Sequence, residues 1–308
     1  MKISLVIGAA CLMTLLACGP GRPAQTSADH AAVPKGTAVF TDRLATADEL
    51  TLSMSGVSIP PSGRSYQGWL VGSDGSSYLS LGQLQPAPDG TLSFRWDSPT
   101  SENLLGHYAG FQATVETGPA GAEPKGPVVF AGSLQASGRS LFGPLPSTPS
   151  PVSIGMKQQT ELAVEHGEMA IAAQEIKAWD EMKAHLEHVI NILEGQKGKR
   201  FGDYLGTGVP QNPGDGYGVL AYEKDVLQYL GAYAVVTSGL NTLDESFRTD
   251  VHSVEDICMA GLSLKDQSKA PQLMQDLKLR LQALQGGPVA ELYRAAQKEL
   301  SVPVGPRS

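Results

Sequence analysis

The feature that most constrains the fold is a change in hydrophobic periodicity at a proline-rich stretch, ASGRSLFGPLPSTPSPV (residues 136–152). Before it, short apolar runs alternate with polar residues, which is typical of β-strands. After it, apolar residues recur at steps of three and four, as in amphipathic helices. We therefore expect an α+β fold with two domains, an N-terminal antiparallel β-sandwich followed by an all-α helical bundle, with residues 136–152 as a linker.

The β-sandwich is predicted over residues 37–135. Two turn signals, Ser73-Asp74-Gly75 and Pro88-Asp89-Gly90, separate strand-like runs, because Gly accepts positive φ and Asp hydrogen-bonds its own backbone. Seven short strands in about 100 residues favour a sandwich. The seven runs are TAVFTD, ELTLSMSG, SYQGWLVGS, SYLSLGQLQ, TLSFRW, FQATVET and PVVFAGSL.

The helical bundle is predicted over residues 153–300, with four to six helices and one long irregular loop over 195–218. The segment 219–243 is apolar on almost all sides, which indicates a central, buried helix. Gly195 is expected to end the helix that precedes the loop. Residues 301–308 are expected to form a tail.

The first residues are MKISLVIGAACLMTLLACGPGRP, and their apolar run is too short to span a bilayer. The run ends in Leu-Leu-Ala-Cys, which resembles the lipobox of bacterial lipoproteins. The resemblance implies a signal peptide over 1–17, a lipid-modified Cys18 and a flexible tether over 18–36. It also implies an extracytoplasmic protein, lipid-anchored to the bacterial membrane. The alternatives are an ordinary secretory signal or an uncleaved anchor.

The net charge limits the classes of partner, and the cysteine content limits the possible disulfides. The formal net charge is −8, which argues against nucleic acid or anionic lipid as a partner. Once Cys11 leaves with the signal peptide and Cys18 carries lipid, Cys258 stands alone and no intrachain disulfide is expected. Because Cys258 lies in an apolar helical pattern, we expect it in the core.

Residues 37–135 resemble the extracytoplasmic C-terminal domain of anti-sigma-K factors. Matching motifs are a Tyr-x-x-Trp-Leu strand, a D-G turn and a final P-x-G-P-V-x-x-x-G segment. In this chain the motif residues are Tyr66, Trp69, Leu70, Pro124, Gly126, Pro127, Val128 and Gly132. The resemblance implies a sensory or interaction domain outside the membrane.

The chain departs from that family because it lacks a sigma-binding domain, a transmembrane helix and an HxxxCxxC zinc motif. The expected function is a non-enzymatic binding or sensing module with a protein or peptide partner at the cell envelope. One form of it is a regulator related to the anti-sigma system. The helical half contains E-H-V-x-N-x-x-E-G followed by N-P-G-D-G. In this it resembles a helical module of bacterial surface lipoproteins. The resemblance implies no particular activity.

Histidines suggest the alternative, a metal- or haem-binding helical bundle. On a helical wheel, His185 borders the apolar face of its helix, whereas His188 lies nearly opposite that face. His166 borders the apolar face of the preceding helix, so it could approach His185 if the two helices are antiparallel. His252 could join from a further helix. The candidate metal ligands are His166, His185 and His188. Converging histidines suit zinc, copper or haem, but histidines at the edge of an apolar face are also common structural residues, and we expect no cofactor.

Two weaker hypotheses remain, a calcium site and an enzymatic activity. In GDYLGTGVPQNPGDG, Asp203 fits the first position of a calcium loop, but the next ligand positions are Leu205 and Thr207, and Asp215 falls one place late. An ordered loop without calcium is the competing interpretation. No G-x-S-x-G, H-E-x-x-H or phosphate-binding glycine loop is present, so no enzymatic activity is expected.

Overall fold

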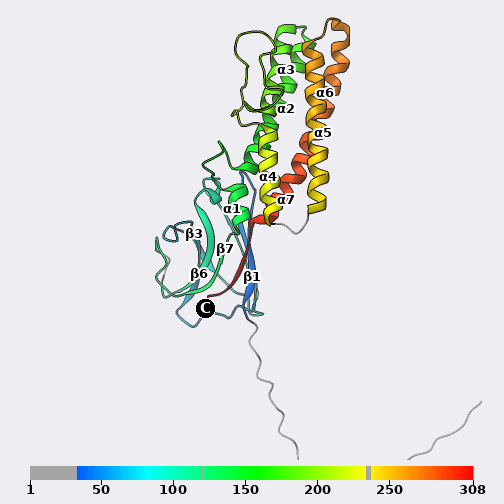
Figure 1. The fold of residues 1–308 in the computed structure, drawn as a ribbon. Helices are drawn as coiled ribbons and strands as arrows, with labels where there is room; N and C mark the ends of the chain where they lie inside the picture. Colours follow the sequence, from blue (N-terminus) through cyan, green and yellow to red (C-terminus); the bar gives the residue numbers. More distant parts are fainter. Residues whose placement is uncertain (1–32, 119–120, 234–236, 308) are drawn as a thin grey trace, which may run out of the picture. The chain divides into compact units, whose positions relative to one another are not determined.

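The computed structural model describes residues 33–118, 121–233 and 237–307 (Figure 1). The predicted signal peptide and the lipid-modified Cys18 lie outside the described residues. Within the described part, no helix has the length and apolar character that crossing a membrane requires.

Within the described ranges, eight strands form one antiparallel sheet in the order β4-β3-β6-β7-β8-β1-β2-β5, which is nearly closed into a barrel. The first seven strands confirm the seven predicted runs. The strands are β1 (Lys35–Thr41), β2 (Glu49–Ser55), β3 (Ser65–Gly72), β4 (Tyr78–Leu84), β5 (Leu92–Asp97), β6 (Tyr108–Glu116), β7 (Val128–Ser133) and β8 (Ser301–Pro306).

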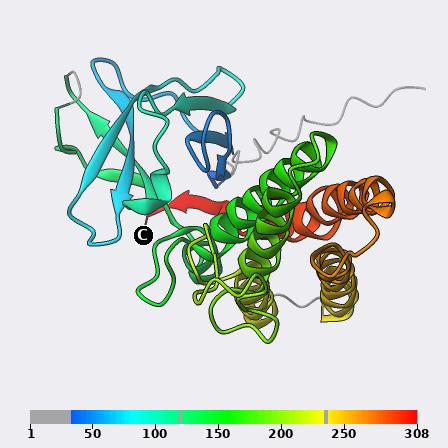
Figure 2. The ribbon, with the colours of Figure 1, turned by 90° about the horizontal axis from the view of Figure 1, so that it is seen from above.

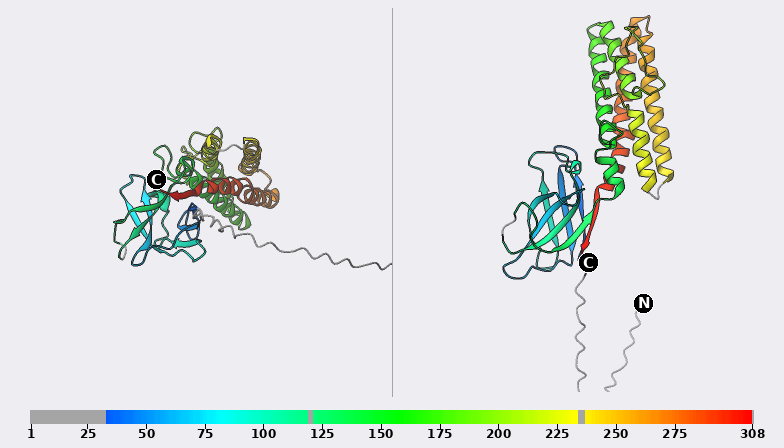
Figure 3. Two further views of the ribbon diagram at one scale, coloured as in Figure 1. Left: turned by 90° about the horizontal axis from the view of Figure 1, so that it is seen from below. Right: turned by 60° about the vertical axis from the view of Figure 1, so that its left-hand side comes forward.

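The predicted fold class, a β-sandwich followed by a separate all-α bundle in a second domain, was wrong. The eighth strand follows all the helices in sequence, yet it lies between β7 and β1 in the sheet (Figure 3). Ala38 of β1 pairs with Val302, and Ala131 of β7 pairs with Gly305. The helices are therefore an insertion between two neighbouring strands of a single sheet.

Residues 301–308 were expected to form a tail, and that expectation was wrong, because 301–306 are β8 and the side chains of Val302 and Val304 are buried in the core. The predicted linker 136–152 is also partly regular. It contains helix α1, in which Leu141 and Phe142 are fully buried. Both segments connect the sheet to the helices through packed side chains.

In the described residues, seven α-helices form the insertion, and α2 lies beside both α3 and α6 (Figure 2). The predicted helix 219–243 is in fact α4 and the beginning of α5. The helices are α1 (Ala136–Phe142), α2 (Val152–Glu175), α3 (Trp179–Glu194), α4 (Val219–Tyr233), α5 (Thr237–Leu262), α6 (Ala270–Leu284) and α7 (Ala290–Gln297).

Polar contacts and a continuous core join the helices to the sheet. Asp42, directly after β1, accepts hydrogen bonds from the Tyr293 hydroxyl at 2.7 Å and the Gln297 amide at 3.1 Å, both on α7. Ser137 of α1 donates to Glu299 near the start of β8. The buried apolar side chains of sheet and helices form one cluster. The insertion is thus packed onto the sheet from which it emerges.

Two predicted chain reversals have the expected backbone. Gly75 has φ of +73°, and the Asp74 carboxylate accepts the N–H groups of Ser76 and Ser77. Gly195 ends α3 with φ of +67°, and a Cβ there would lie 2.2 Å from the Tyr217 carbonyl oxygen. Glycine at 195 is therefore needed both for the left-handed backbone and for the close approach of the two ends of the loop 196–218.

Candidate metal centre

The candidate site lies between α2 and α3, which a short turn over residues 176–178 joins. The helices α2 and α3 lie against each other. Both carry fully buried apolar side chains, among them Ala163 and Ala170 of α2 and Leu186 and Val189 of α3. This packing brings His166 of α2 toward the side chains of α3.

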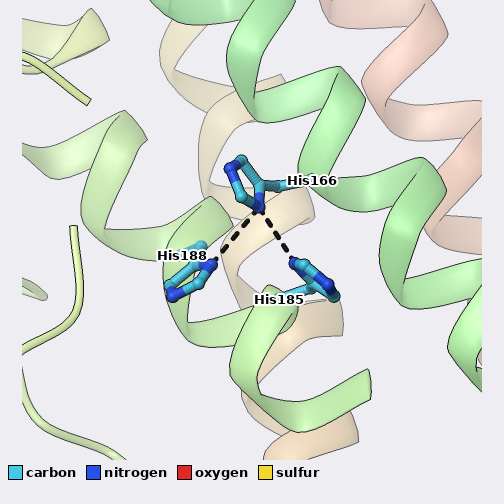
Figure 4. A group of neighbouring side chains, drawn as sticks. All are labelled: His166, His185 and His188. Carbon is cyan, nitrogen blue, oxygen red and sulfur yellow. Dashed lines mark hydrogen bonds between the residues drawn. The ribbon is translucent and has the colours of Figure 1, made fainter. Parts of the chain in front are cut away.

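Three histidine side chains converge at this point (Figure 4). The Nδ1 atom of His166 lies 3.0 Å from Nδ1 of His185 and 3.3 Å from Nδ1 of His188. One ligand nitrogen from each residue lies within 4.8 Å of the other two. In the described ranges, no other group of three or more His, Cys, Asp or Glu side chains is arranged to hold a metal ion.

Burial and the neighbouring imidazoles favour the neutral form of His166 and His188. His166 is 8% exposed, and burial together with the nearby His188 and His185 lowers its pKa to about 4. Burial and His185 also lower the pKa of His188, and the charge of Glu187 opposes that shift. Neutral imidazole is the form that binds metals. At neutral pH, His166 and His188 therefore present lone pairs and not positive charges.

Hydrogen bonding within the trio of His166, His185 and His188 cannot satisfy all of its nitrogens. A neutral imidazole nitrogen carries either one hydrogen or one lone pair. If Nδ1–H of His185 and Nδ1–H of His188 both donate, they share the single lone pair on Nδ1 of His166. If His166 donates, it satisfies one neighbour and not the other. A cation at the centre would instead engage three lone pairs at once.

Sequence reasoning anticipated the approach of His166 and His185 but misplaced His188. The helical wheel assumed that α3 has one buried face. In the structure, polar residues on other sides of α3 are buried as well, including Glu187, Asn191 and Glu194. A position far from the apolar face of α3 can therefore still be partly buried, as His188 is.

The loop 196–218 covers those polar residues of α3. One oxygen of Glu187 accepts the N–H groups of Tyr204 and Leu205, each at 2.9 Å, and its other oxygen accepts the N–H of Gln211 at 2.9 Å. Asn191 donates to the carbonyl oxygens of Gly202 and Gln211 and accepts the N–H of Gly202. Sequence reasoning missed this role of Glu187, since its partners are backbone groups.

The calcium candidates are engaged in local hydrogen bonds. Asp203 accepts the N–H groups of Thr207 and Gly208. Asp215 accepts the N–H of Tyr217 and the hydroxyl of Tyr222. Throughout the described part of the chain, neither carboxylate belongs to a group of three potential ligands. These contacts support the interpretation of 196–218 as an ordered loop.

The remaining candidates lie outside the trio. His252 is exposed on α5 and is not among the converging histidines. Cys258 is fully buried on the same helix, which confirms its predicted place in the core, and burial raises the pKa of its thiol. Its burial gives no support for a reactive thiol.

Comparison with protein-family models, with curated proteins and with solved structures finds no match to this chain. The resemblance of residues 37–135 to anti-sigma-K factors therefore stays a prediction. The site has to be interpreted from its own geometry.

The low pKa of His166 predicts a pH dependence of the metal-free protein. Between pH 6.5 and about 4, unfolded His166 takes up a proton that the folded state excludes, so stability is lost as the pH falls through this range. We expect a loss of about 1–3 kcal/mol. Urea unfolding with a chelator present, at several pH values, measures it. The His166→Gln variant should show a weaker dependence, and an identical dependence in the variant would contradict the assignment.

Proposed function

We propose that the protein binds a divalent transition-metal ion, of the class that prefers imidazole ligands, through His166, His185 and His188. The convergence of three imidazole nitrogens in a partly buried site carries this proposal. Zinc and copper are the ions that such nitrogen ligands favour. If the predicted lipid anchor at Cys18 is correct, the protein would hold this ion outside the cytoplasm.

The spacing of the nitrogens supports a single ion. With Zn–N bonds of about 2.0–2.1 Å, two ligands at a tetrahedral angle lie about 3.4 Å apart. The distances from His166 to its two neighbours, 3.0 and 3.3 Å, are close to this value. The third separation, between His185 and His188, is the one that a bound ion would set, and both side chains are partly exposed. Their side chains have room to adjust.

The surroundings of His185 also suit metal binding. Its Nε2 atom lies 4.0 Å from a carboxylate oxygen of Glu181, on the side of the ring away from the trio. Metal-bound histidines commonly direct their second N–H to a carboxylate, which orients the ring and strengthens the ligand. Glu181 would serve as this partner.

A bare ion fits better than haem. Two axial ligands of haem lie on opposite faces of the porphyrin, whereas these nitrogens lie within hydrogen-bond distance of His166. A bound zinc ion with three histidine ligands would supply an open fourth position with Lewis acidity. We propose binding of the ion as the function, in agreement with the expectation of a non-enzymatic protein.

The test is zinc binding to the full chain, purified without a histidine tag. We expect one Zn²⁺ per chain by dialysis and mass spectrometry, and an increase in unfolding free energy of about 3 kcal/mol when free zinc is 100 times Kd. Co²⁺ in its place should give the visible absorption of a tetrahedral site. His166→Gln, His185→Gln and His188→Gln should each weaken binding at least about tenfold.

The control is His107→Gln, which removes an exposed histidine of the sheet region and should leave zinc binding unchanged. Equal zinc binding by the wild type and His166→Gln, or no bound metal in a correctly folded wild-type protein, would overturn the proposal.

A further inference from the structure

A second site lies between the loop 196–218 and the helices α4 and α5. A cavity of about 740 Å³ opens there, within the range of small-molecule sites. Its lining shares no residue with the histidine trio. We infer that this cavity binds a small organic anion that carries either a phosphate group or several carboxylate groups.

The lining of the cavity is strongly basic in a chain whose net charge is −8. Glu194 is its single acidic residue. None of the ion pairs in the described ranges involves its three lysines. The positively charged side chains and the histidine of the lining are Lys197, Lys199, Arg200, Lys224, Arg248 and His252.

Carboxyl groups of the protein hold the two arginines of the lining in place. Arg200 lies 3.2 Å from the buried Glu255 and donates to the exposed Asp256 at 2.7 Å. Arg248 donates in the same way to the fully buried Glu223 at 3.0 Å. An arginine fixed in this way loses less conformational freedom when it binds an oxyanion.

The buried carboxyl groups provide a second, independent observation. Oε1 of Glu223 and both oxygens of Glu255 accept no hydrogen bond from any described residue, although both side chains are fully buried. Burial raises the pKa of each to about 8. Both groups are therefore largely protonated at neutral pH. Arg200 then keeps Asp256, and Arg248 keeps Asp244, as its ionised partner, and both of these carboxylates are exposed to solvent.

The lining also contains less polar residues. These are Tyr217, Leu220 and Ala221, and the Tyr217 hydroxyl is already donated to Asp225. An inorganic ion would fill a small part of a cavity of this size. The combination of basic and apolar residues in one lining therefore fits an organic anion, with its charged group on Lys224 and Arg248 and its body on Tyr217 and Leu220.

The test is calorimetric titration of the full chain at low ionic strength with three probes, namely phenyl phosphate, inorganic pyrophosphate and citrate. We expect binding of at least one probe in the millimolar range or tighter, weakened as salt is added. Charge reversal at exposed positions, Lys224→Glu or Lys197→Glu with Lys199→Glu, should weaken it at least about tenfold. Lys278→Glu makes the same change at an exposed position of α6 outside the lining, and it should not change the affinity for the probes.

The outcomes distinguish the possibilities. Binding of phenyl phosphate or pyrophosphate without citrate would assign a phosphate group, and the reverse pattern would assign a carboxylate. No binding of any probe by folded protein, or equal losses in Lys224→Glu and Lys278→Glu, would overturn the inference. Zinc titrations of the same variants keep this result separate from the histidine trio.

Discussion

Removal of β8 is expected to abolish cooperative unfolding of the protein. A chain that ends at Leu300 loses a strand that pairs with both β1 and β7. The backbone groups of those two neighbours would then lack partners inside the sheet, and the core would lose the buried side chains of Val302 and Val304. Circular dichroism during thermal and urea unfolding measures the effect, with near-ultraviolet signals reporting side-chain packing.

A milder change keeps this prediction testable if the truncated chain does not accumulate. Val302→Asp places a charge at a fully buried position of β8 and should lower the unfolding free energy by about 4 kcal/mol or more. Deletion of Arg307 and Ser308, beyond β8, is the matched control and should cost about 1 kcal/mol or less. A folded, cooperative protein ending at Leu300 would show that the sheet does not need its last strand.

Glu187→Ala should have the second largest effect, a loss of about 3 kcal/mol in unfolding free energy. The substitution removes the acceptor for the N–H groups of Tyr204, Leu205 and Gln211, each worth about 1–3 kcal/mol when left buried without a partner. Part of this cost is recovered because the exposed side of the loop can reach water. Urea unfolding gives the free energy, and limited proteolysis should cut the loop 196–218 faster than in the wild type.

Glu187→Gln is the informative comparison. Glutamine keeps the shape and one acceptor oxygen, but its amide group would face an N–H donor, so an intermediate loss is expected. Glu181→Ala, on the exposed side of the same helix, should change stability by about 0.5 kcal/mol or less. Wild-type stability and unchanged proteolysis in Glu187→Ala would mean that these hydrogen bonds do not hold the loop.

The strands that could be predicted are those with a local signature. In β2, Leu50, Leu52 and Met54 alternate with more exposed residues, and turn residues separate β2 from its neighbours. The last strand offers much less, because SVPVGP has two apolar alternating positions and two prolines. Proline is rare inside a sheet since it donates no backbone hydrogen bond. The place of β8 depends on partners at the far end of the chain, which no local pattern encodes.

The candidate site was predictable to a similar degree. The apolar faces of α2 and α3 suggested that His166 and His185 could meet. His188 could not be placed, because the burial of its side of α3 depends on hydrogen bonds from the backbone of the loop 196–218. Backbone N–H groups are the same in every residue, so such contacts leave no trace in residue type. The basic cavity was missed because its residues come from three separate segments.

The insertion of the helices between β7 and β8 has a consequence for the order of folding. Ala38 and Val302 pair from opposite ends of the described chain, so early pairing would close a very long loop at a high entropic cost. Helices form quickly from neighbouring residues and need no such closure. Once the insertion has folded and packed, it holds the start of β8 near the sheet. We therefore expect the helical insertion to assemble first. The barrel should close last, when β8 pairs with β7 and β1.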